Sequence, residues 1–158
     1  MENNSLLDVQ HLSHMFHLKR KMTVKAIDDV SFQIKKGEIY GLVGESGSGK
    51  STVARCIMNI YKPSEGEIFY KGIPICKSKE FRKNRKMLQM TRQMIFQDSA
   101  SSLNPRMKIE DIVAEPLRIY SGKGRPGKKE IEKQLELVGL DRSYMEKYPC
   151  ELSGGQRQ

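Results

Sequence analysis

The stretch Gly-Glu-Ser-Gly-Ser-Gly-Lys-Ser-Thr at residues 44–52 fits the pattern G-x-x-x-x-G-K-[ST] of a phosphate-binding loop. The apolar run 39–43 before it predicts a buried strand. The residues Val53, Ile57 and Ile60 after it have helical spacing and predict a helix. A glycine-rich loop between a strand and a helix can turn successive backbone N–H groups inward to bind an anion. The stretch therefore predicts an α/β fold with a site for nucleotide phosphates.

Individual groups in this loop have expected roles at a bound nucleotide. The glycines allow close approach of the phosphates, and the helix that begins at Lys50 adds the positive end of its dipole. The Lys50 ammonium is expected to reach the β- and γ-phosphates, and the Ser51 hydroxyl is expected to ligate Mg²⁺. Thr52 is expected on the α-phosphate side. The candidate nucleotide-binding residues of the loop are Gly44, Glu45, Ser46, Gly47, Ser48, Gly49, Lys50, Ser51 and Thr52.

A second candidate motif is the stretch Leu-Ser-Gly-Gly-Gln at residues 152–156. A serine hydroxyl and glycine N–H groups at the start of a helix can bind a phosphate oxygen. The same residues could instead form a turn that only caps a helix. The motif by itself leaves both interpretations open, and its occurrence together with a phosphate loop favours nucleotide binding.

Together, GESGSGKST and LSGGQRQ resemble the ATP-binding cassette (ABC) family. The stretch Phe-Gln-Asp-Ser-Ala-Ser-Ser-Leu-Asn-Pro-Arg-Met at 96–107 is similar to the oligopeptide and dipeptide importer branch of that family. Glu-Pro-Leu at 115–117 and Tyr-Pro at 148–149 are similar to the same branch. The resemblance covers the whole chain. It implies an α/β P-loop NTPase domain of the ABC type, with an N-terminal antiparallel β segment and a helical subdomain.

The resemblance also implies a function and partners. It implies an ATPase subunit that binds ATP and Mg²⁺ and pairs head to tail with a second ABC ATPase subunit, so that two ATP molecules lie between them. Such a subunit drives a transmembrane permease from the cytoplasmic face of the cell membrane. An extracytoplasmic solute-binding protein is an indirect partner. The expected process is ATP-driven import of peptides or related small solutes.

Roles for single residues follow from the same resemblance. Residues 44–52 correspond to the Walker A loop, and Gln97 corresponds to the Q-loop glutamine, which ligates Mg²⁺ and senses the γ-phosphate. Lys50 and Gln97 are therefore the catalytic candidates, and Ser51 and Gln97 are the metal candidates. The signature motif, which contacts the ATP held by the partner subunit, corresponds to Ser153, Gly154, Gly155 and Gln156.

An aromatic ring that stacks on adenine is expected before the Walker A loop, and Phe16 is the best positional match. His14 and His17 could also face the base, and an aromatic residue in a strand is more often a core residue. The spacing of His11, His14 and His17 could suggest a metal site on a helix. The surrounding residues alternate as in a strand, however, so packed or solvated histidines are favoured.

The Walker B motif has no match in the sequence. ABC ATPases carry a strand of four apolar residues followed by Asp and a catalytic Glu, and neither Asp98 nor Asp111 follows such a run. Phosphoryl transfer depends on metal positioning and an oriented water. We therefore expect a C-terminally incomplete domain, a fragment that does not hydrolyse ATP at a useful rate when isolated.

The resemblance implies one partial domain over residues 1–158, and the pattern along the chain agrees with it. Residues 1–96 hold a β segment through about residue 38 and the Walker A core, residues 97–150 the Q-loop and helical subdomain, and residues 151–158 the signature motif. A strand at 67–70 is predicted in the first part. In the second part helices are predicted by Ile109, Ile112, Val113, Pro116 and Leu117, and by Ile131, Leu135 and Val138 with Gly139 as C-cap.

The net charge is +9, and residues 77–92 hold seven cations against one acid. This run has few aromatic residues, and a solvated helix face or nearby anionic lipid accounts for it as well as nucleic acid does. Nucleic-acid binding is therefore disfavoured. Neither a membrane span nor a signal peptide is indicated. Cys56, Cys76 and Cys150 lack C-x-x-C pairing, which favours reduced thiols packed as small hydrophobic side chains.

Two function classes remain open. One is the ATP-binding subunit of a peptide-type importer, and the other is a soluble ABC-type ATPase or nucleotide-binding regulatory module that acts on DNA or protein. The segment after Gln97 favours the first, because in the family it receives a short coupling helix from the permease. Arg106 and Met107 are the candidate contacts. The cargo cannot be read from this subunit, because the substrate is selected elsewhere in the complex.

Overall fold

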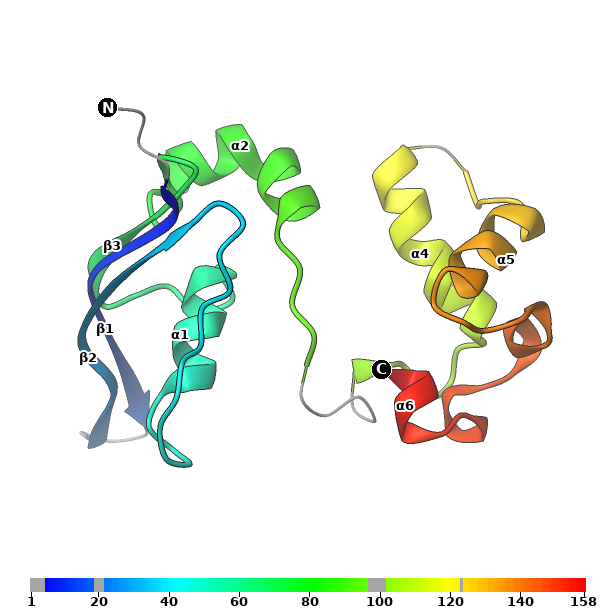
Figure 1. Cartoon of the computed structure of the whole chain (residues 1–158), viewed down its shortest axis with the longest axis horizontal. Helices are drawn as coiled ribbons and strands as arrows, with labels where there is room; N and C mark the ends of the chain where they lie inside the picture. The colour runs from blue at the N-terminus through cyan, green and yellow to red at the C-terminus, as the bar shows by residue number, and fades with distance from the viewer. Residues whose placement is uncertain (1–4, 19–21, 97–101, 123) are drawn as a thin grey trace. The chain divides into compact units, whose positions relative to one another are not determined.

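The computed structural model describes residues 5–18, 22–96, 102–122 and 124–158. The chain forms two compact units, residues 1–94 and 95–158. Figure 1 labels most of the helices and strands of both units. Each unit has its own hydrophobic core, and the two cores share no residue, so each is held together by its own packing.

A four-stranded antiparallel sheet is the frame of the first unit (Figure 1). Its strands are β1 (Ser5–Leu18), β2 (Met22–Lys35), β3 (Glu65–Tyr70) and β4 (Ile73–Pro74), in the order β2-β1-β3-β4. In the middle of the sheet, Val9 of β1 pairs with Phe32 on one side and with Ile68 on the other. The predicted N-terminal β segment and the strand near residues 67–70 are confirmed.

Strand β1 bends at His11, where its register with both neighbours shifts and φ is 50°. Strand β3 passes very close to this bend. A Cβ on Gly66 would lie 2.2 Å from the carbonyl oxygen of His11. Because Gly66 also has φ of 85°, only glycine allows the two strands to approach there.

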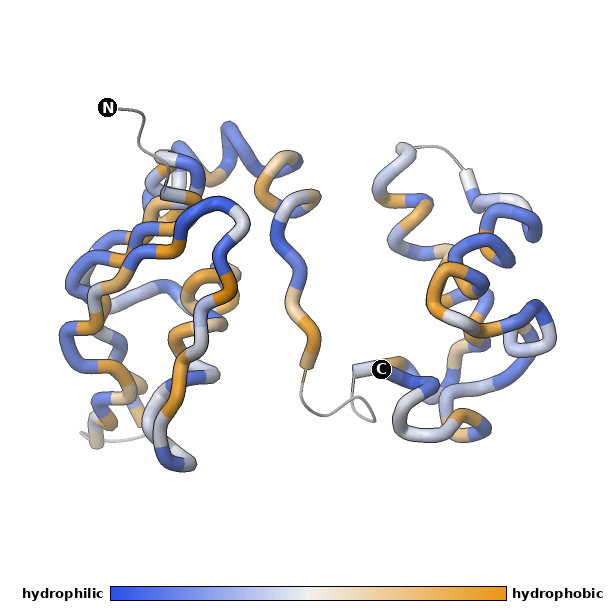
Figure 2. The backbone as a smooth tube through the Cα atoms, in the orientation of Figure 1, coloured by the Kyte–Doolittle hydropathy of each residue, from blue (hydrophilic) through white to orange (hydrophobic). Residues whose placement is uncertain are grey.

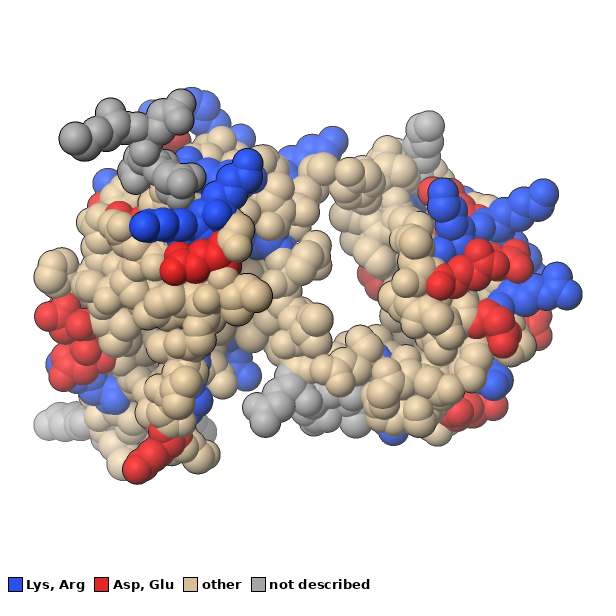
Figure 3. Space-filling model, in the orientation of Figure 1, with Lys and Arg blue, Asp and Glu red and all other residues tan. Residues whose placement is uncertain are grey.

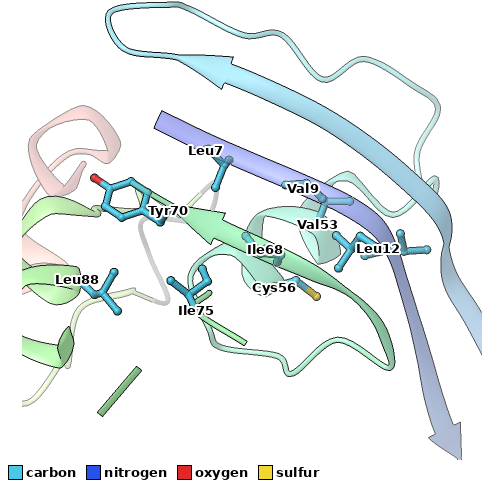
Figure 4. Packing of buried hydrophobic residues seen from close by; sticks show 10 residues of the cluster. Leu7, Val9, Leu12, Val53, Cys56, Ile68, Tyr70, Ile75 and Leu88 are labelled. Atoms are coloured by element: carbon cyan, nitrogen blue, oxygen red, sulfur yellow. The ribbon is translucent and has the colours of Figure 1, made fainter. Parts of the chain in front are cut away.

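Helix α1 (Lys50–Ile57) packs on this sheet through Val53 and Cys56 (Figure 4). They meet the side chains of Leu12 and Ile68, which have no exposed surface. Full burial of an aliphatic side chain of this size contributes about 1.5–3 kcal/mol. An eight-residue helix is too short to be stable alone in water, so α1 depends on this packing.

Helix α2 (Ser78–Thr91) completes the core with Leu88, and Arg92 directly after it connects α2 to the end of α1. The Arg92 Nη1 donates to the carbonyl oxygen of Ile57 at 2.6 Å and to Oδ1 of Asn59 at 2.9 Å. Burial lowers the pKa of the Arg92 guanidinium from its ordinary value. Its charge lies at the negative end of the α1 dipole, where a cation is favourable.

The predicted strand at residues 39–43 is wrong. The structure has no strand there, and Ile39 and Val43 are 99% and 95% exposed. A strand needs a neighbour whose N–H and C=O groups complete the ladder, and this segment pairs with none of the described strands, although the Tyr40 ring stacks on Phe32 of β2 at 5.0 Å between centroids. A second apolar run, residues 94–96, lies in the described segment that follows α2 and is also not a strand (Figure 2). Apolar composition alone therefore did not produce a strand in either segment.

The second unit is helical. Its elements are α4 (Ile109–Ser121), α5 (Lys128–Glu136), the 3-10 helices η1 (Arg142–Glu146) and η2 (Pro149–Glu151), and α6 (Gly154–Arg157). Its core consists of Ile109, Ala114, Ile131, Leu135, Met145 and Leu152. The two predicted helices are confirmed, but Val138 is 70% exposed because α5 ends before it.

The C-cap of α5 is Leu137, not Gly139 as predicted, and Gly139 is the left-handed residue of the turn that follows. It has φ of 78°, and its N–H donates to the carbonyl oxygen of Glu136 at 3.0 Å. The N–H of Leu140 donates to the carbonyl oxygen of Leu135 at 3.0 Å. These two bonds form a Schellman motif, which requires a left-handed residue and so favours glycine.

We expect Gly66→Ala to lower the free energy of unfolding far more than Gly72→Ala does. Both glycines are left-handed, with φ of 85° and 74°, so both substitutions introduce left-handed strain of roughly 1–2 kcal/mol. A Cβ at residue 72 meets open space, whereas one at residue 66 meets the backbone of β1. Urea unfolding measures the difference, and equal losses would contradict the close approach of β3 to β1.

Candidate nucleotide-binding site

The phosphate loop takes its shape from two left-handed glycines and one close contact. Gly47 and Gly49 have φ of 84° and 91°, and the N–H of Ser48 donates to the carbonyl oxygen of Glu45 at 3.2 Å. A Cβ on Gly49 would lie 2.2 Å from the carbonyl oxygen of Ala26 in β2. Glycine at position 49 therefore lets the start of α1 rest directly on the sheet.

Helix α1 starts without a side-chain cap. Its N-cap residue is Gly49, no side chain accepts a hydrogen bond from its first turn, and no acidic residue lies in that turn. The first N–H groups of a helix have no acceptor within the helix, and the helix dipole adds partial positive charge there. A phosphate group would satisfy these donors and this charge together.

The Lys50 side chain bends back over the loop. Its Nζ donates to the carbonyl oxygens of Gly44 at 2.7 Å and Glu45 at 2.6 Å, and to Oγ of Ser48 at 3.1 Å. A phosphate oxygen carries negative charge and is a stronger acceptor than these neutral groups. The glycine loop, the uncapped helix and this cation together fit a nucleoside triphosphate.

The remaining loop side chains lie at or near the surface. Ser51 is exposed in the first turn of α1, Thr52 is half-buried, and Glu45 and Ser46 are exposed. The Ser51 hydroxyl is an oxygen donor of the kind that Mg²⁺ prefers. The roles of Ser51 and Thr52 at a bound nucleotide stay predictions.

Phe16 lies in β1 of the same unit as the loop. Its partner in β2 is two residues before Ala26, the residue that contacts Gly49. Phe16 is half-buried. Of the two alternative base contacts, His14 is 8% exposed and His17 is exposed. Adenine stacking by Phe16 stays a prediction.

Sequence reasoning missed Tyr61. Its ring centroid lies 5.3 Å from that of Phe16 and 5.5 Å from that of His14. The spacing between residues 16 and 61 gives no signal of this contact. It forms because the segment after α1 folds back onto β1, which is a tertiary event.

The Ser153 motif starts helix α6 in the second unit. The Oγ of Ser153 accepts from the N–H of Gln156 at 3.3 Å, and Oε1 of Gln156 accepts from the N–H of Ser153 at 2.9 Å. This pair is a capping box, so the motif does cap a helix. The Nε2 of Gln156 also donates to the Tyr144 hydroxyl at 2.8 Å. Because the Ser153 oxygen accepts in this arrangement, its O–H can still donate to an oxygen outside the unit.

Gln97 and residues 98–101 lie outside the described residues. The contact of Gln97 with a metal ion therefore stays a prediction. In the described segment that follows, Arg106 is exposed and its N–H donates to Oδ1 of Asn104 at 3.1 Å. Met107 is half-buried and lines a groove with Asp111, Ala114, Glu115, Arg118 and Arg125. The groove carries charges of both signs, which include an ion pair between Arg125 and Asp111 with 2.7 Å from Nη2 to Oδ1.

The basic run lies on α2. Its exposed cations are Lys79, Arg82, Lys83, Arg85 and Lys86, and none of them joins an ion pair within the described part of the chain. Lys77 differs, because its hydrogen bond to Glu67, 2.9 Å between Nζ and Oε1, raises its pKa. Figure 3 shows Lys and Arg side chains over α2 and both charges over α5.

The three cysteines lie in different environments. Cys56 is buried, and burial raises the pKa of its thiol to about 11, so it packs as a protonated, apolar group. Cys76 is half-buried and Cys150 is exposed, so the predicted packing is wrong for Cys150. The described residues contain no group of His, Cys, Asp and Glu that could hold a metal ion. None of the described helices could span a membrane.

Comparison with known proteins gives one consistent family. Residues 27–158 match the ABC transporter family. The oligopeptide transport ATP-binding protein OppF of Bacillus subtilis (strain 168) is 48% identical over 161 residues, which are 97% of this chain and 50% of that protein. The putative oligopeptide transport ATP-binding protein YkfD of the same organism is 44% identical over 163 residues, which are 100% of this chain and 48% of that protein. The chain thus spans about half the length of the curated relatives it matches.

A solved structure shows the same similarity. The dimeric post-hydrolysis state of the ATP-binding cassette MJ0796, bound to ADP and Pi, matches with a TM-score of 0.75 and 26% identity. The match covers 96% of this chain and 65% of that chain. The fold of an ABC cassette and the capacity to bind nucleotide therefore agree with the loop geometry.

We expect Gly49→Ala to unfold at a lower temperature than Gly47→Ala when no nucleotide is present. The two glycines share a left-handed φ, so the backbone strain of the two variants is matched. Only a Cβ at residue 49 meets Ala26, and α1 would have to move off the sheet to accept it. Thermal unfolding followed by circular dichroism gives both midpoints. A larger loss in Gly47→Ala would show that α1 does not start against β2.

Proposed function

Because the chain belongs to the ABC transporter family, we propose that it supplies the phosphate loop and the signature motif of an ATPase subunit that energises solute import. Relatives named as oligopeptide transport ATP-binding proteins are 44% and 48% identical to it, which supports peptides or related small solutes as the cargo. Since the chain spans about half of those relatives, hydrolysis and transport are proposed for the complete subunit.

The observation that carries the proposal is the Lys50 ammonium held across a glycine loop at an uncapped helix start. The phosphates of bound ATP replace the carbonyls of Gly44 and Glu45 as acceptors for Nζ. The first-turn N–H groups of α1 and the loop N–H groups bind the remaining phosphate oxygens. These residues bind and orient the triphosphate and offset charge that develops on the γ-phosphate during transfer.

Mg²⁺ is the proposed metal cofactor, with Ser51 and Gln97 as its ligands. When bound, it neutralises charge on the β- and γ-phosphate oxygens. Two side-chain oxygens suit this ion, because Mg²⁺ keeps several waters and takes other ligands from the phosphates. The first-turn position and exposure of Ser51 support this role.

A second ABC ATPase subunit is the proposed partner at the signature motif, in a head-to-tail pair that is either a homodimer or a heterodimer. Gly154 and Gly155 are exposed, and a Cβ on either would meet nothing within 4 Å. Alanine in a helix is favoured over glycine by about 1 kcal/mol, and steric crowding by the described residues does not require glycine at either position. Close approach of a phosphate on the partner subunit explains them. The dimeric MJ0796 structure supports such a pairing.

Permease subunits are the proposed membrane partners, and the complete subunit is proposed to lie at the cytoplasmic face of the cell membrane. The exposed Arg106 and the groove beside Met107 are the proposed contacts for the permease. A hydrogen bond within the turn, from Arg106 to Asn104, gives that segment a defined shape to present. A solute-binding protein outside the membrane takes part indirectly, through the permease.

The alternative, a soluble ABC-type ATPase or regulatory module acting on DNA or protein, rests on the exposed cations of α2 (Figure 3). Lys and Arg without acidic partners can neutralise phosphates of nucleic acid. A solvated helix face explains the same charges. Duplex DNA binding that weakens steeply with salt, in a protein that does not associate with a permease, would favour this alternative.

We expect Lys50→Ala to abolish ATP hydrolysis by the complete transport complex and to weaken ATP binding by about ten- to a hundredfold. That range corresponds to the loss of a charge-assisted contact. Lys36→Ala, which removes an exposed lysine in the turn after β2, is the matched control and should leave both properties unchanged. Calorimetry and phosphate release give the two readouts, and unchanged hydrolysis in Lys50→Ala would contradict the proposed role.

Ser153→Arg should abolish hydrolysis in the complete complex while ATP binding to the monomeric subunit is nearly unchanged. The reason is that the phosphate contacted by Ser153 belongs to the partner subunit. Gly155→Ala provides a smaller change, because its Cβ meets open space within the unit and should not lower stability. Calorimetry measures ATP binding to the monomer. If Ser153→Arg loses monomer ATP affinity as strongly as it loses hydrolysis, the result argues against contact across a dimer.

A further inference from the structure

Three aromatic side chains of the first unit form a compact group, here called the ring cluster: His14, Phe16 and Tyr61. The rings of His14 and Tyr61 are parallel, with an angle of 5° and centroids 5.5 Å apart. Phe16 stands perpendicular to both, at 87° and 4.7 Å from His14 and at 86° and 5.3 Å from Tyr61. Stacked and edge-to-face arrangements are both favourable for aromatic rings. Two perpendicular neighbours restrict the rotation of the Phe16 ring.

Backbone hydrogen bonds keep Tyr61 in the ring cluster. Its N–H donates to the carbonyl oxygen of Arg55 in α1 at 3.3 Å, and the Arg55 guanidinium lies 5.8 Å from the centre of its ring. Ser64 connects the same segment to β1. Its N–H donates to the carbonyl oxygen of Ser13 at 2.9 Å, and its Oγ accepts from the N–H of Met15 at 3.0 Å. Tyr61 is thus tied both to the helix that begins at the phosphate loop and to the strand that carries the other two rings.

His14 is an unexpected residue for this position. It is 8% exposed, and its Nδ1 is buried without a hydrogen-bond partner among the described residues. A buried polar atom without a partner is unfavourable compared with an aliphatic side chain of similar size. An aliphatic side chain, however, has no flat face to stack on Tyr61. The parallel stack therefore gives a physical reason for a planar ring at residue 14.

We propose that His14 and Tyr61 are positioning residues for base recognition, which hold the Phe16 ring at a fixed angle for stacking on a purine. The inference rests on the proposed function, because it requires a nucleotide at the phosphate loop and its base on Phe16. Phe16 is half-buried, so the residue is not closed off from solvent. A ring that is already ordered loses less conformational entropy when the base binds. The ring cluster thereby sets the preference of the site for purine over pyrimidine nucleotides.

The test compares binding of ATP, CTP and inorganic tripolyphosphate to the full-length protein by calorimetry. His14→Leu should weaken ATP binding by about tenfold, as expected for a lost base stack, weaken CTP binding less, and leave tripolyphosphate binding unchanged. His14→Phe keeps a flat ring and should bind ATP like the unmodified protein. In a Phe16→Ala background, His14→Leu should have no further effect, because His14 acts through the Phe16 ring.

Three results would overturn the inference. His14→Leu could weaken ATP and tripolyphosphate equally, which would mean that His14 supports the loop as a whole. His14→Phe could lose as much ATP affinity as His14→Leu, which would exclude a role for ring shape. A loss of ATP affinity in His14→Phe has this meaning even if His14→Leu is unstable. If the unmodified protein does not bind tripolyphosphate, the proposed function is overturned, and this inference with it. This result differs from the other two because it is seen without any substitution.

Discussion

The contact between Gly49 and the carbonyl oxygen of Ala26 is the constraint on which the first unit depends. The register of β1 with β2 shifts between His14, which pairs with Ile27, and Met15, which pairs with Lys25. At this shift Ala26 of β2 has no paired residue in β1. At this bulge the sheet meets the last residue of the phosphate loop, with no room for a side chain. The start of α1, and with it the uncapped helix end, is therefore fixed relative to the sheet.

The other end of α1 is fixed by a different kind of interaction. Arg92 donates to the carbonyl oxygen of Ile57 and to the side chain of Asn59, so the helix is held at its C-terminus by a partly buried cation. Between the two ends, Val53 and Cys56 are buried in the core. A helix this short gains its stability from such contacts and not from its own hydrogen bonds. The position of the phosphate loop is consequently a property of the whole unit.

The two motifs proposed to contact phosphate belong to units with separate cores, and they reach their local shapes in different ways. The loop at residues 44–52 needs the sheet beneath Gly49. The turn at Ser153 is shaped by its own capping box and by the Tyr144 hydroxyl, which lie within the second unit. A Cβ on either of its two exposed glycines would meet open space, so both positions are sterically accessible.

Sequence patterns alone predict the glycine loop, the antiparallel β segment, the two helices of the second unit and the left-handed turn at Gly139. These features depend on residues close together in the chain: a glycine pattern, a two-residue alternation, a helical period and a left-handed cap. For the same reason the Ser153 turn could be predicted as a helix start. Each motif carries its own local geometry.

Which distant segments meet depends on tertiary packing. The apolar residues 39–43 look like a strand, but strand formation requires backbone pairing with a neighbour, and they pair with no described strand. The exposure of Cys150 and the stacking of Tyr61 on His14 likewise depend on how distant segments pack. The need for glycine at residue 49 is of both kinds: the motif names the residue, but the carbonyl of Ala26, 23 residues earlier, supplies the steric reason.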